Sequence, residues 1–327
     1  MSVTATDIVR DSAPESTKVA SDLTSELKGL SELRRTRIES IQELQHLRKS
    51  HVFVLWTWES LDFEDFYTLV DMLEDEDPKQ DLDLIVFSFG GSGEAGFRIG
   101  HTFHEWAAKR KLRFRVIIPL YAMSAATILT LGADEVVMGL SSQLGPIDPQ
   151  IPMTDRSGRT RYVPALALFD GLKLVSEYFE KIEHMQPILE QIIRDEHLSL
   201  VDLGLKERMR ESGKQYAEIL LTGGMIPDSA KARECADLLT DYFKYHGHPI
   251  DAYEAERRLG LKIRHSDGEE WRAIKKIRDA YVEFVNQPGL LRGAIVSCAI
   301  ETATLRKWRF APLRDPSEPT RKLDTTQ

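Results

Sequence analysis

Cysteine is scarce in this sequence, with Cys235 and Cys298 alone among 327 residues. Two cysteines cannot build the disulfide framework of a small secreted protein, and this pair lacks the spacing of zinc ligands. So few cysteines indicate a reducing compartment, and we expect a cytoplasmic protein. The sequence predicts neither a metal nor a cofactor.

An excess of basic residues is also missing. The 43 lysines and arginines are outnumbered by 52 aspartates and glutamates, which leaves a net charge of −9. Binding to nucleic acid requires positive charge for the phosphates, so the composition argues against a general nucleic-acid binder. We expect protein or peptide partners, without nucleic acid.

Export and membrane signals are weak. The first twenty residues are polar and carry acids, without the apolar core of a secretory signal. One uncharged run, residues 116–133, approaches the length of a membrane span. It contains Pro119, Ser124 and two threonines, and it begins like a strand. We therefore expect a buried strand followed by a buried helix, and no membrane span.

The length of the chain permits a large core, and its pattern predicts alternating strands and helices. The expected strands cover residues 51–56, 83–88, 113–118 and 134–138, and the helices between them cover 62–77, 94–110 and 125–131. Strands and helices in alternation imply a parallel sheet with right-handed crossovers, whose functional loops gather at one edge. The fold class is therefore α/β.

The ends of the chain differ from this middle part. Residues 1–16 are polar, and residues 19–48 read as an amphipathic helix that either packs on its own domain or pairs between subunits. After a turn-rich loop at 143–150 and an exposed segment at 151–164, helices are expected, followed by an apolar, β-like segment and a loose tail from Pro312. The helices are placed at 165–196, 200–221, 228–243, 252–260 and 269–285, and the apolar segment at 293–304.

Ser124 stands between the expected strand 113–118 and the apolar helix 125–131. A serine at a helix start commonly caps the helix through its hydroxyl. A side chain on a strand-to-helix turn also projects from the carboxyl edge of the sheet, next to the positive end of the helix dipole, where an attacking oxygen is useful. Ser124 is thus either a cap or a nucleophile.

Gly90 and Gly91 end another strand at the same edge, ahead of Ser92 and Gly93. The segment lacks the Lys-Ser/Thr pair of a P-loop, and Gly91, Gly93 and Gly96 match the dinucleotide spacing only loosely. Adjacent glycines do allow backbone N–H groups to approach a carbonyl oxygen, as an oxyanion hole requires. A plain tight turn is the alternative.

A serine nucleophile needs a base within hydrogen-bond reach. Among nine histidines, His246 and His248 lie in a loop beside Pro249. His101 and His104 fall on an expected helix, and His184 and His197 have charged helical surroundings. Lys173 is a second candidate base. Asp148, in the loop at 143–150, either orients a histidine or caps its turn.

Four ordered motifs together resemble a known fold. They are Phe87–Gly96, Tyr121–Ala125, Leu144–Gln150 and His246–Ala255 with Leu259–Leu261. Their order is similar to the Clp/crotonase fold, a ββα superhelix. Gly-Pro-Ile-Asp-Pro-Gln and His-x-x-Pro-Ile resemble the serine dehydrogenase proteinase family, a Clp-fold group of serine peptidases. The resemblance covers roughly residues 50–265, and it divides the chain into 1–50, a peptidase domain at 51–265, and a C-terminal extension at 266–327.

The resemblance implies a serine peptidase in which Ser124 attacks a peptide carbonyl while the N–H groups of Gly91 and Ala125 hold the oxyanion. Clp peptidases place a histidine about twenty-five residues after the serine, where this chain has Asp148. The family's Ser, Asp and His set would then be Ser124, Asp148 and His246, with the last two exchanged in chain order. Relatives with a Ser–Lys dyad place the lysine near the position of Lys173, which stays the alternative base.

Three functions follow from this sequence. The first is a cytoplasmic serine endopeptidase that forms a homo-oligomer, as relatives of this fold commonly do. The second is an oligomeric Clp-fold scaffold without catalysis, which would capture a partner through the helix at 19–48. The third is a crotonase-type acyl-CoA enzyme, which would use the oxyanion N–H groups and need no serine.

Overall fold

The computed structural model describes residues 32–154, 157–164, 200–286 and 294–312, with six single positions between 167 and 177. Four expected features lie wholly or partly outside these ranges. They are the polar start, the first part (19–31) of the helix expected at 19–48, most of the helix expected at 165–196, and the tail after residue 312. His184 and His197 also lie outside these ranges.

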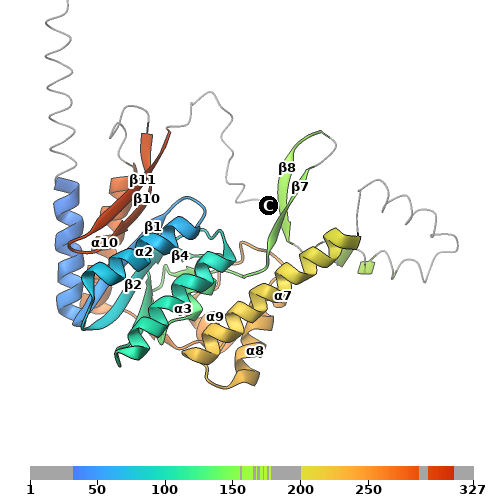
Figure 1. Ribbon diagram of the computed structural model, residues 1–327, viewed down its shortest axis with the longest axis horizontal. Helices are drawn as coiled ribbons and strands as arrows, with labels where there is room; N and C mark the ends of the chain where they lie inside the picture. Colours follow the sequence, from blue (N-terminus) through green and yellow to red (C-terminus); the bar gives the residue numbers. More distant parts are fainter. Residues whose placement is uncertain are drawn as a thin grey trace, which may run out of the picture.

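A mixed sheet forms the centre of the molecule (Figure 1). Within the described residues its strand order is β11-β10-β1-β2-β3-β5-β9. Strands β1, β2, β3, β5 and β9 run parallel, and β10 and β11 are antiparallel additions beside β1. The bounds are β1 Ser50–Thr57, β2 Asp81–Phe87, β3 Phe114–Ile118, β5 Glu135–Met138, β9 Ile263–His265, β10 Ala294–Glu301 and β11 Arg306–Pro312.

The strands are apolar on both faces because both faces are covered. In β1, Phe53 and Leu55 enter one hydrophobic core, whereas Val54 and Trp56 enter the other. The first core is closed by α2 (Phe63–Glu76), α3 (Gly93–Lys109) and α4 (Ala125–Leu131). The second is closed by the helix at residues 32–48 and by α10 (Gly268–Asn286), so the body has three layers.

The helix at residues 32–48 packs on its own chain. Ile41 and Leu44 are fully buried in the second core. Arg37 is also buried, and its Nε donates to Glu301 of β10 at 2.9 Å while the guanidinium lies 3.6 Å from the centre of the Phe284 ring. For these residues, the alternative of packing within the subunit is the one observed.

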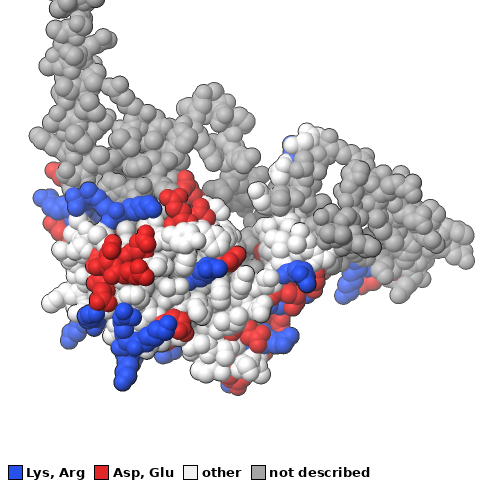
Figure 2. Space-filling view, viewed as in Figure 1, with Lys and Arg blue, Asp and Glu red and all other residues white. Residues whose placement is uncertain are grey.

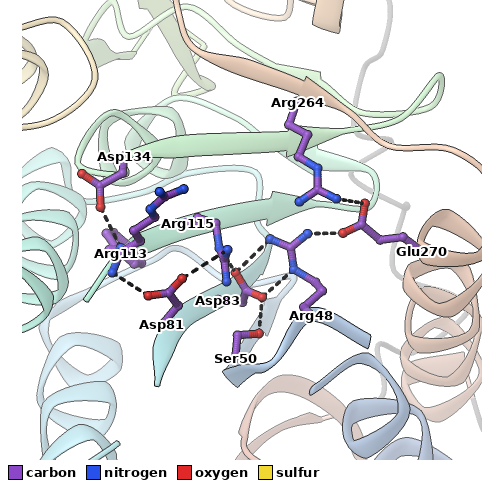
Figure 3. A network of polar contacts seen from close by, with 10 residues as sticks. Arg48, Ser50, Asp81, Asp83, Arg113, Arg115, Asp134, Arg264 and Glu270 are labelled. Carbon is purple, nitrogen blue, oxygen red and sulfur yellow. Dashed lines mark hydrogen bonds and ion pairs between the residues drawn. The ribbon is translucent and has the colours of Figure 1, made fainter. Parts of the chain in front are cut away.

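Charged residues close the amino ends of the parallel strands (Figure 3). Asp83 of β2 is fully buried and accepts hydrogen bonds from Arg48 Nε at 2.5 Å, Arg115 Nε at 2.7 Å and the Ser50 hydroxyl. Arg48 also donates to Glu270 of α10. Burial acts to lower the pKa of Arg48, but its hydrogen bonds to Asp83 and Glu270 and the charges of both acids hold that pKa above its usual value.

The surface over this body carries both signs of charge. Figure 2 shows acidic residues gathered over α2 and basic residues at the far end of α3. α3 ends at Lys109, and Arg110 and Lys111 follow it. Cations at a helix C-terminus interact favourably with the helix dipole.

The segment after β5 builds a second, smaller region (Figure 1). It contains the short strand β6 (Gln143–Leu144), which pairs with β4 (Tyr121–Ala122), and then the helices α7 (Leu200–Gly223), α8 (Ser229–Asp237) and α9 (Ala252–Arg257). α8 continues into a π-helical turn, Leu238–Tyr242, which we call the π-turn.

Three expectations from the sequence need correction. The exposed segment at 151–164 forms an antiparallel hairpin of β7 (Gln150–Thr154) and β8 (Thr160–Pro164) that projects from the body (Figure 1). The helix expected at 228–243 is α8 followed by the π-turn. β9 and β11 were not expected, because each depends on a partner strand that is distant in sequence, β5 for β9 and β10 for β11.

The uncharged run at residues 116–133 divides between β3, β4 and α4. Within the described residues, no helix has both the length and the apolar character needed to cross a membrane.

Candidate functional site

Ser124 lies on a strained turn between β4 and α4. Its backbone has φ 52° and ψ −115°, a conformation that residues other than glycine rarely adopt. The hydroxyl makes no capping hydrogen bond to α4, so Ser124 is not the cap that a serine at a helix start commonly provides. Such strain persists only where the surrounding structure enforces it, and it clusters at functional sites.

Glycines on α3 bring α4 close enough to fix this turn. A side chain at Gly100 would place its Cβ 2.6 Å from the carbonyl oxygen of Leu129, and one at Gly96 would collide with the carbonyl of Ala125. These glycines therefore allow close packing of α3 on α4. Gly96, one of the three glycines that loosely match a dinucleotide-binding motif, is therefore explained by the packing of α3 on α4.

The turn at Gly90 and Gly91 lies directly against Ser124. Gly90 has φ 108° and Gly91 has φ 151°. A Cβ at Gly90 would lie 2.8 Å from Ser124 Cβ and 3.3 Å from the nitrogen of Ala125. The two turns predicted from the sequence to share one edge of the sheet are thus in contact.

Backbone hydrogen bonds join the two turns. The N–H of Ser88 donates to Tyr121, and the N–H of Met123 donates to Ser88, both at 3.0 Å. The hydroxyl of Ser88 accepts from the N–H of Gly90 at 3.1 Å. Ser88 therefore fixes the glycine turn and the serine turn to each other, a role that sequence analysis missed because a serine at a strand end has no distinctive signal.

Aromatic rings support the glycine turn from the side of the second core. The ring of Phe89 lies 5.5 Å from that of Trp58 and 5.6 Å from that of Tyr121. Phe87 lies beneath them, 4.6 Å from Trp58 and 5.6 Å from Phe89. The packing of these rings restricts the residue that precedes Gly90.

Two backbone donors at this junction are available. Among the hydrogen bonds formed between described residues, none uses the N–H of Gly91 or of Ala125. Ala125 is the first residue of α4, so its N–H has no partner within the helix. Free N–H groups at a helix start favour a negatively charged oxygen.

Asp148 and His246 form a hydrogen-bonded pair. Asp148 Oδ1 lies 2.7 Å from His246 Nδ1, although the two residues are 98 positions apart in sequence. The side chain of Asp148 is 3% exposed and that of His246 is 27% exposed. Gln150 Nε2 donates to the other carboxylate oxygen at 3.0 Å. Asp148 therefore contacts the imidazole, which is the first of its two predicted roles.

Short backbone pairings bring the two loops beside the serine turn. Leu144 exchanges two hydrogen bonds of 2.9 Å with Ile250, so the loop before Asp148 lies antiparallel to the loop after His246. Leu144 also pairs with Ala122 of β4. The segments that carry Ser124, Asp148 and His246 are therefore neighbours in one layer.

Thr127 completes this connection. Its hydroxyl shares its proton between the carbonyl oxygens of Ala122 at 2.7 Å and Gly145 at 2.9 Å, and it accepts from the N–H of Gly145 at 3.1 Å. A Cβ at Gly145 would lie 2.6 Å from the terminal carbon of Met123. A buried threonine within an apolar helix did not single itself out in the sequence, although it holds the Asp148 loop on the serine turn.

The remaining candidate bases have other surroundings. His248 Nε2 lies 3.2 Å from Glu254, and its ring stacks on Phe243 at 4.6 Å. His101 lies on α3 with its ring 5.5 Å from that of Phe97, and His104 Nδ1 lies 3.9 Å from Asp134. Lys173 is helical and exposed.

No metal or redox centre emerges from the described ranges. No group of three His, Cys, Asp or Glu side chains within them could hold an ion. Cys235 and Cys298 are both buried and form no disulfide, and Cys298 Sγ donates to Asp65 at 3.5 Å. Burial raises the pKa of the Cys235 thiol to about 12, so this residue is not a reactive thiolate.

Two uncharacterized proteins of Methanocaldococcus jannaschii are related to this chain in sequence. MJ1495 is 26% identical over 241 residues, covering 72% of this chain and 70% of its own, and MJ0137 is 25% identical over 267 residues, covering 80% of each chain.

Solved structures of proteases are also similar. The 1510-N membrane-bound stomatin-specific protease, in complex with a substrate peptide, aligns with a TM-score of 0.37 and 10% identity, over 81% of this chain and 86% of that one. ClpP1 from Listeria monocytogenes aligns with a TM-score of 0.32 and 14% identity, over 73% of this chain and 96% of that one.

The family model of the ClpP-like SDH-type serine proteinases matches residues 14–288, which is most of the chain. That match confirms the resemblance predicted from the four ordered motifs, and with it the Clp-like α/β fold. The protein belongs to the family of ClpP-like SDH-type serine proteinases.

Proposed function

We propose that this protein is a serine endopeptidase in which Ser124 is the nucleophile, His246 the general base and Asp148 the residue that orients the base. The observation that carries the proposal is the 2.7 Å contact between Asp148 Oδ1 and His246 Nδ1. It is supported by the pairing of Leu144 with Ile250 and with Ala122, which joins the segments that carry Asp148, His246 and the strained Ser124.

The tautomer of His246 follows from its partner. A carboxylate accepts hydrogen bonds, so Asp148 accepts one from Nδ1–H of His246, and the neutral imidazole then carries its lone pair on Nε2. Nε2 can then remove the proton of the Ser124 hydroxyl as its oxygen attacks a peptide carbonyl. The buried carboxylate stabilises the imidazolium that forms.

The oxyanion of the tetrahedral intermediate would be held by the N–H groups of Gly91 and Ala125. When this intermediate collapses, His246 returns the proton to the amine leaving group, and an acyl group stays on Ser124. Water, deprotonated by the same imidazole, then releases the acid. One donor of such an oxyanion hole is worth about a hundredfold or more in rate.

The Ser124 hydroxyl makes no hydrogen bond with any described residue. Catalytic hydrogen bonds are commonly long in the free enzyme and tighten when substrate binds. We therefore expect the Ser124–His246 contact to form in the substrate complex. Lys173 remains the alternative base, and it is less favoured because it is exposed, whereas His246 has a buried carboxylate partner in Asp148.

Fluorophosphonate labelling tests the proposal. The wild type should be labelled, Ser124→Ala should not, and Ser157→Ala, which alters an exposed serine in the hairpin between β7 and β8, should match the wild type. His246→Ala and Asp148→Ala should each slow labelling, and Lys173→Ala should leave the rate unchanged.

Each outcome decides one part of the mechanism. A folded wild type that stays unlabelled would remove Ser124 as nucleophile and leave the non-catalytic scaffold. Slow labelling of Lys173→Ala together with normal labelling of His246→Ala would assign the base to Lys173. Light scattering on the same samples tests the expected homo-oligomer.

A further inference from the structure

The π-turn, Leu238–Tyr242, ends four residues before His246. π-helical turns are rare, and many lie at functional sites. Leu239 and Thr240 are fully buried, and Phe243 is nearly so. The π-turn is therefore anchored in the core by Leu239 and Thr240, whereas Tyr242 and Tyr245 on the way to His246 are exposed.

The same turn is bonded to the segment of Asp148. The carbonyl of Leu239 accepts a hydrogen bond of 3.0 Å from the N–H of Ile147, the residue before Asp148. The π-turn is thus joined to the residue before Asp148 by a backbone hydrogen bond, and it precedes His246 by four residues in the chain. A shift of this turn would move Asp148 and His246 differently.

An ion cluster fixes the turn to α7. Arg210 Nη1 lies 2.9 Å from each carboxylate oxygen of Asp241, and Lys214 Nζ donates to Oδ2 at 2.5 Å. The Arg210 side chain is 15% exposed and that of Lys214 is 16% exposed. Glu207, one turn earlier on α7, holds Arg210 from the other side.

The pKa values of the two cations reflect these contacts. The hydrogen bond to Glu207, followed by that to Asp241, raises the pKa of Arg210 above its usual value. Burial acts to lower the pKa of Lys214, and hydrogen bonds to Asp237 and Asp241 raise it. Both side chains therefore remain cationic beside the turn.

We propose that Asp241 is a positioning residue: clamped by Arg210 and Lys214, it holds the π-turn in the place from which the Asp148 and His246 loops are aligned with Ser124. The inference rests on the proposed function, since it concerns the geometry of the same base. A displacement of about 1 Å at a catalytic group can cost about a hundredfold in rate.

Asp241→Asn tests the clamp, and Asp237→Asn is its matched control. Both variants remove one negative charge beside Lys214, since Asp237 Oδ1 lies 2.8 Å from Lys214 Nζ, but Asp237 belongs to α8 and precedes the turn. Hydrogen–deuterium exchange of the peptide that contains Ile147 reports the bond to Leu239. Exchange should accelerate at least tenfold in Asp241→Asn and less than twofold in Asp237→Asn.

Peptide cleavage tests the catalytic consequence. In Asp241→Asn the kcat should fall tenfold or more with KM unchanged, and in Asp237→Asn both should stay within twofold of the wild type. Asp241→Glu, which retains the charge, should restore part of the lost kcat. If Asp241→Asn does not fold, Arg210→Gln removes the same contact from α7 and has the same expected outcome.

Equal exchange and equal kcat in the two variants would overturn the proposal, as would faster exchange at Ile147 with an unchanged kcat. The exchange measurement needs no catalysis, and labelling of the wild type by a fluorophosphonate tests the nucleophile by itself. A failure of the clamp is therefore distinguishable from a failure of the proposed peptidase.

Discussion

The two edges of the central sheet differ in the residues that form them: buried charged side chains at the amino edge, and glycines with a strained serine at the carboxyl edge. At the amino edge, buried charges face each other, and Asp83 alone accepts hydrogen bonds from Arg48, Arg115 and Ser50 (Figure 3). At the carboxyl edge, Gly90, Gly91 and the strained Ser124 lie in contact. One edge satisfies its polar groups with ion pairs, whereas the other leaves backbone N–H groups available.

We expect the amino edge to contribute mainly to the stability of the fold, and the carboxyl edge to contribute mainly to the chemistry of the site. Ion pairs at the amino edge connect the helix at residues 32–48, β2, β3 and α10, so their loss should destabilise the whole sheet. Strain and free donors at the carboxyl edge add little to stability, and they suit a site that binds a developing negative charge. Three substitutions test this division.

Asp83→Ala should have the largest effect. It leaves the buried guanidinium groups of Arg48 and Arg115 without their shared carboxylate, and the free energy of unfolding should fall by about 3–5 kcal/mol. Urea denaturation measures this change, and the kcat of the folded fraction should equal that of the wild type. Asp81→Ala is the control, since its 3.5 Å contact to Arg115 is partly exposed and is expected to contribute about 1 kcal/mol or less. Equal free energies of unfolding for Asp83→Ala and Asp81→Ala would contradict the stabilising role that we assign to the buried ion pairs of the amino edge.

Gly90→Ala should have a smaller total effect, expressed in catalysis. The new Cβ would lie 2.8 Å from Ser124 Cβ and 2.9 Å from the carbonyl oxygen of Met123, so the glycine turn must shift. We expect peptide cleavage to fall about a hundredfold as the donors move away from the oxyanion. Gly158→Ala is the control, because Gly158 also has a positive φ, 80°, but apart from its chain neighbours no heavy atom lies within 4 Å of the place that a Cβ would occupy. A similar loss of activity in both variants would show that the effect is not local.

Ser124→Gly should change the free energy of unfolding least of the three substitutions, and the direction of this change tests whether the turn is strained. Release of the strained φ gains about 1–3 kcal/mol, and the flexibility of glycine in the unfolded chain costs about 0.5–1 kcal/mol. We expect the variant to unfold at a slightly higher temperature than the wild type, without activity. Ser124→Ala removes the same hydroxyl but keeps the strain, so it should show no comparable gain. Identical melting temperatures for the two variants would mean that the turn is not strained.

Local pattern in the sequence was sufficient for the parts of this fold that depend on neighbours in the chain. The apolar runs at 51–56, 83–88 and 113–118 predicted β1, β2 and β3, because a strand buried on both faces needs a continuous apolar stretch. Pro119 and the small residues after Ser124 placed a turn and a helix correctly. The order of these elements also predicted that the glycine and serine turns share one edge.

Contacts between distant segments were beyond such reasoning. β9 and β11 consist of short or polar stretches that become strands only beside β5 and β10. The hairpin at 150–164 contains proline, glycine and charges, and those residues indicated a loop. The π-turn has no sequence signature, since it depends on packing against α7 and on the hydrogen bond from Ile147.

Hydrophobic period, turn residues and motif order in the sequence were enough to predict the α/β order, the family and the residue types of the candidate site. The contact of Asp148 with His246, and a strained Ser124 that does not cap its helix, are visible in the folded protein alone. They depend on residues that are far apart along the chain. A hydrogen bond between residues 98 positions apart is fixed by the pairing of Leu144 with Ile250 and by the π-turn, and local propensity does not encode either of them.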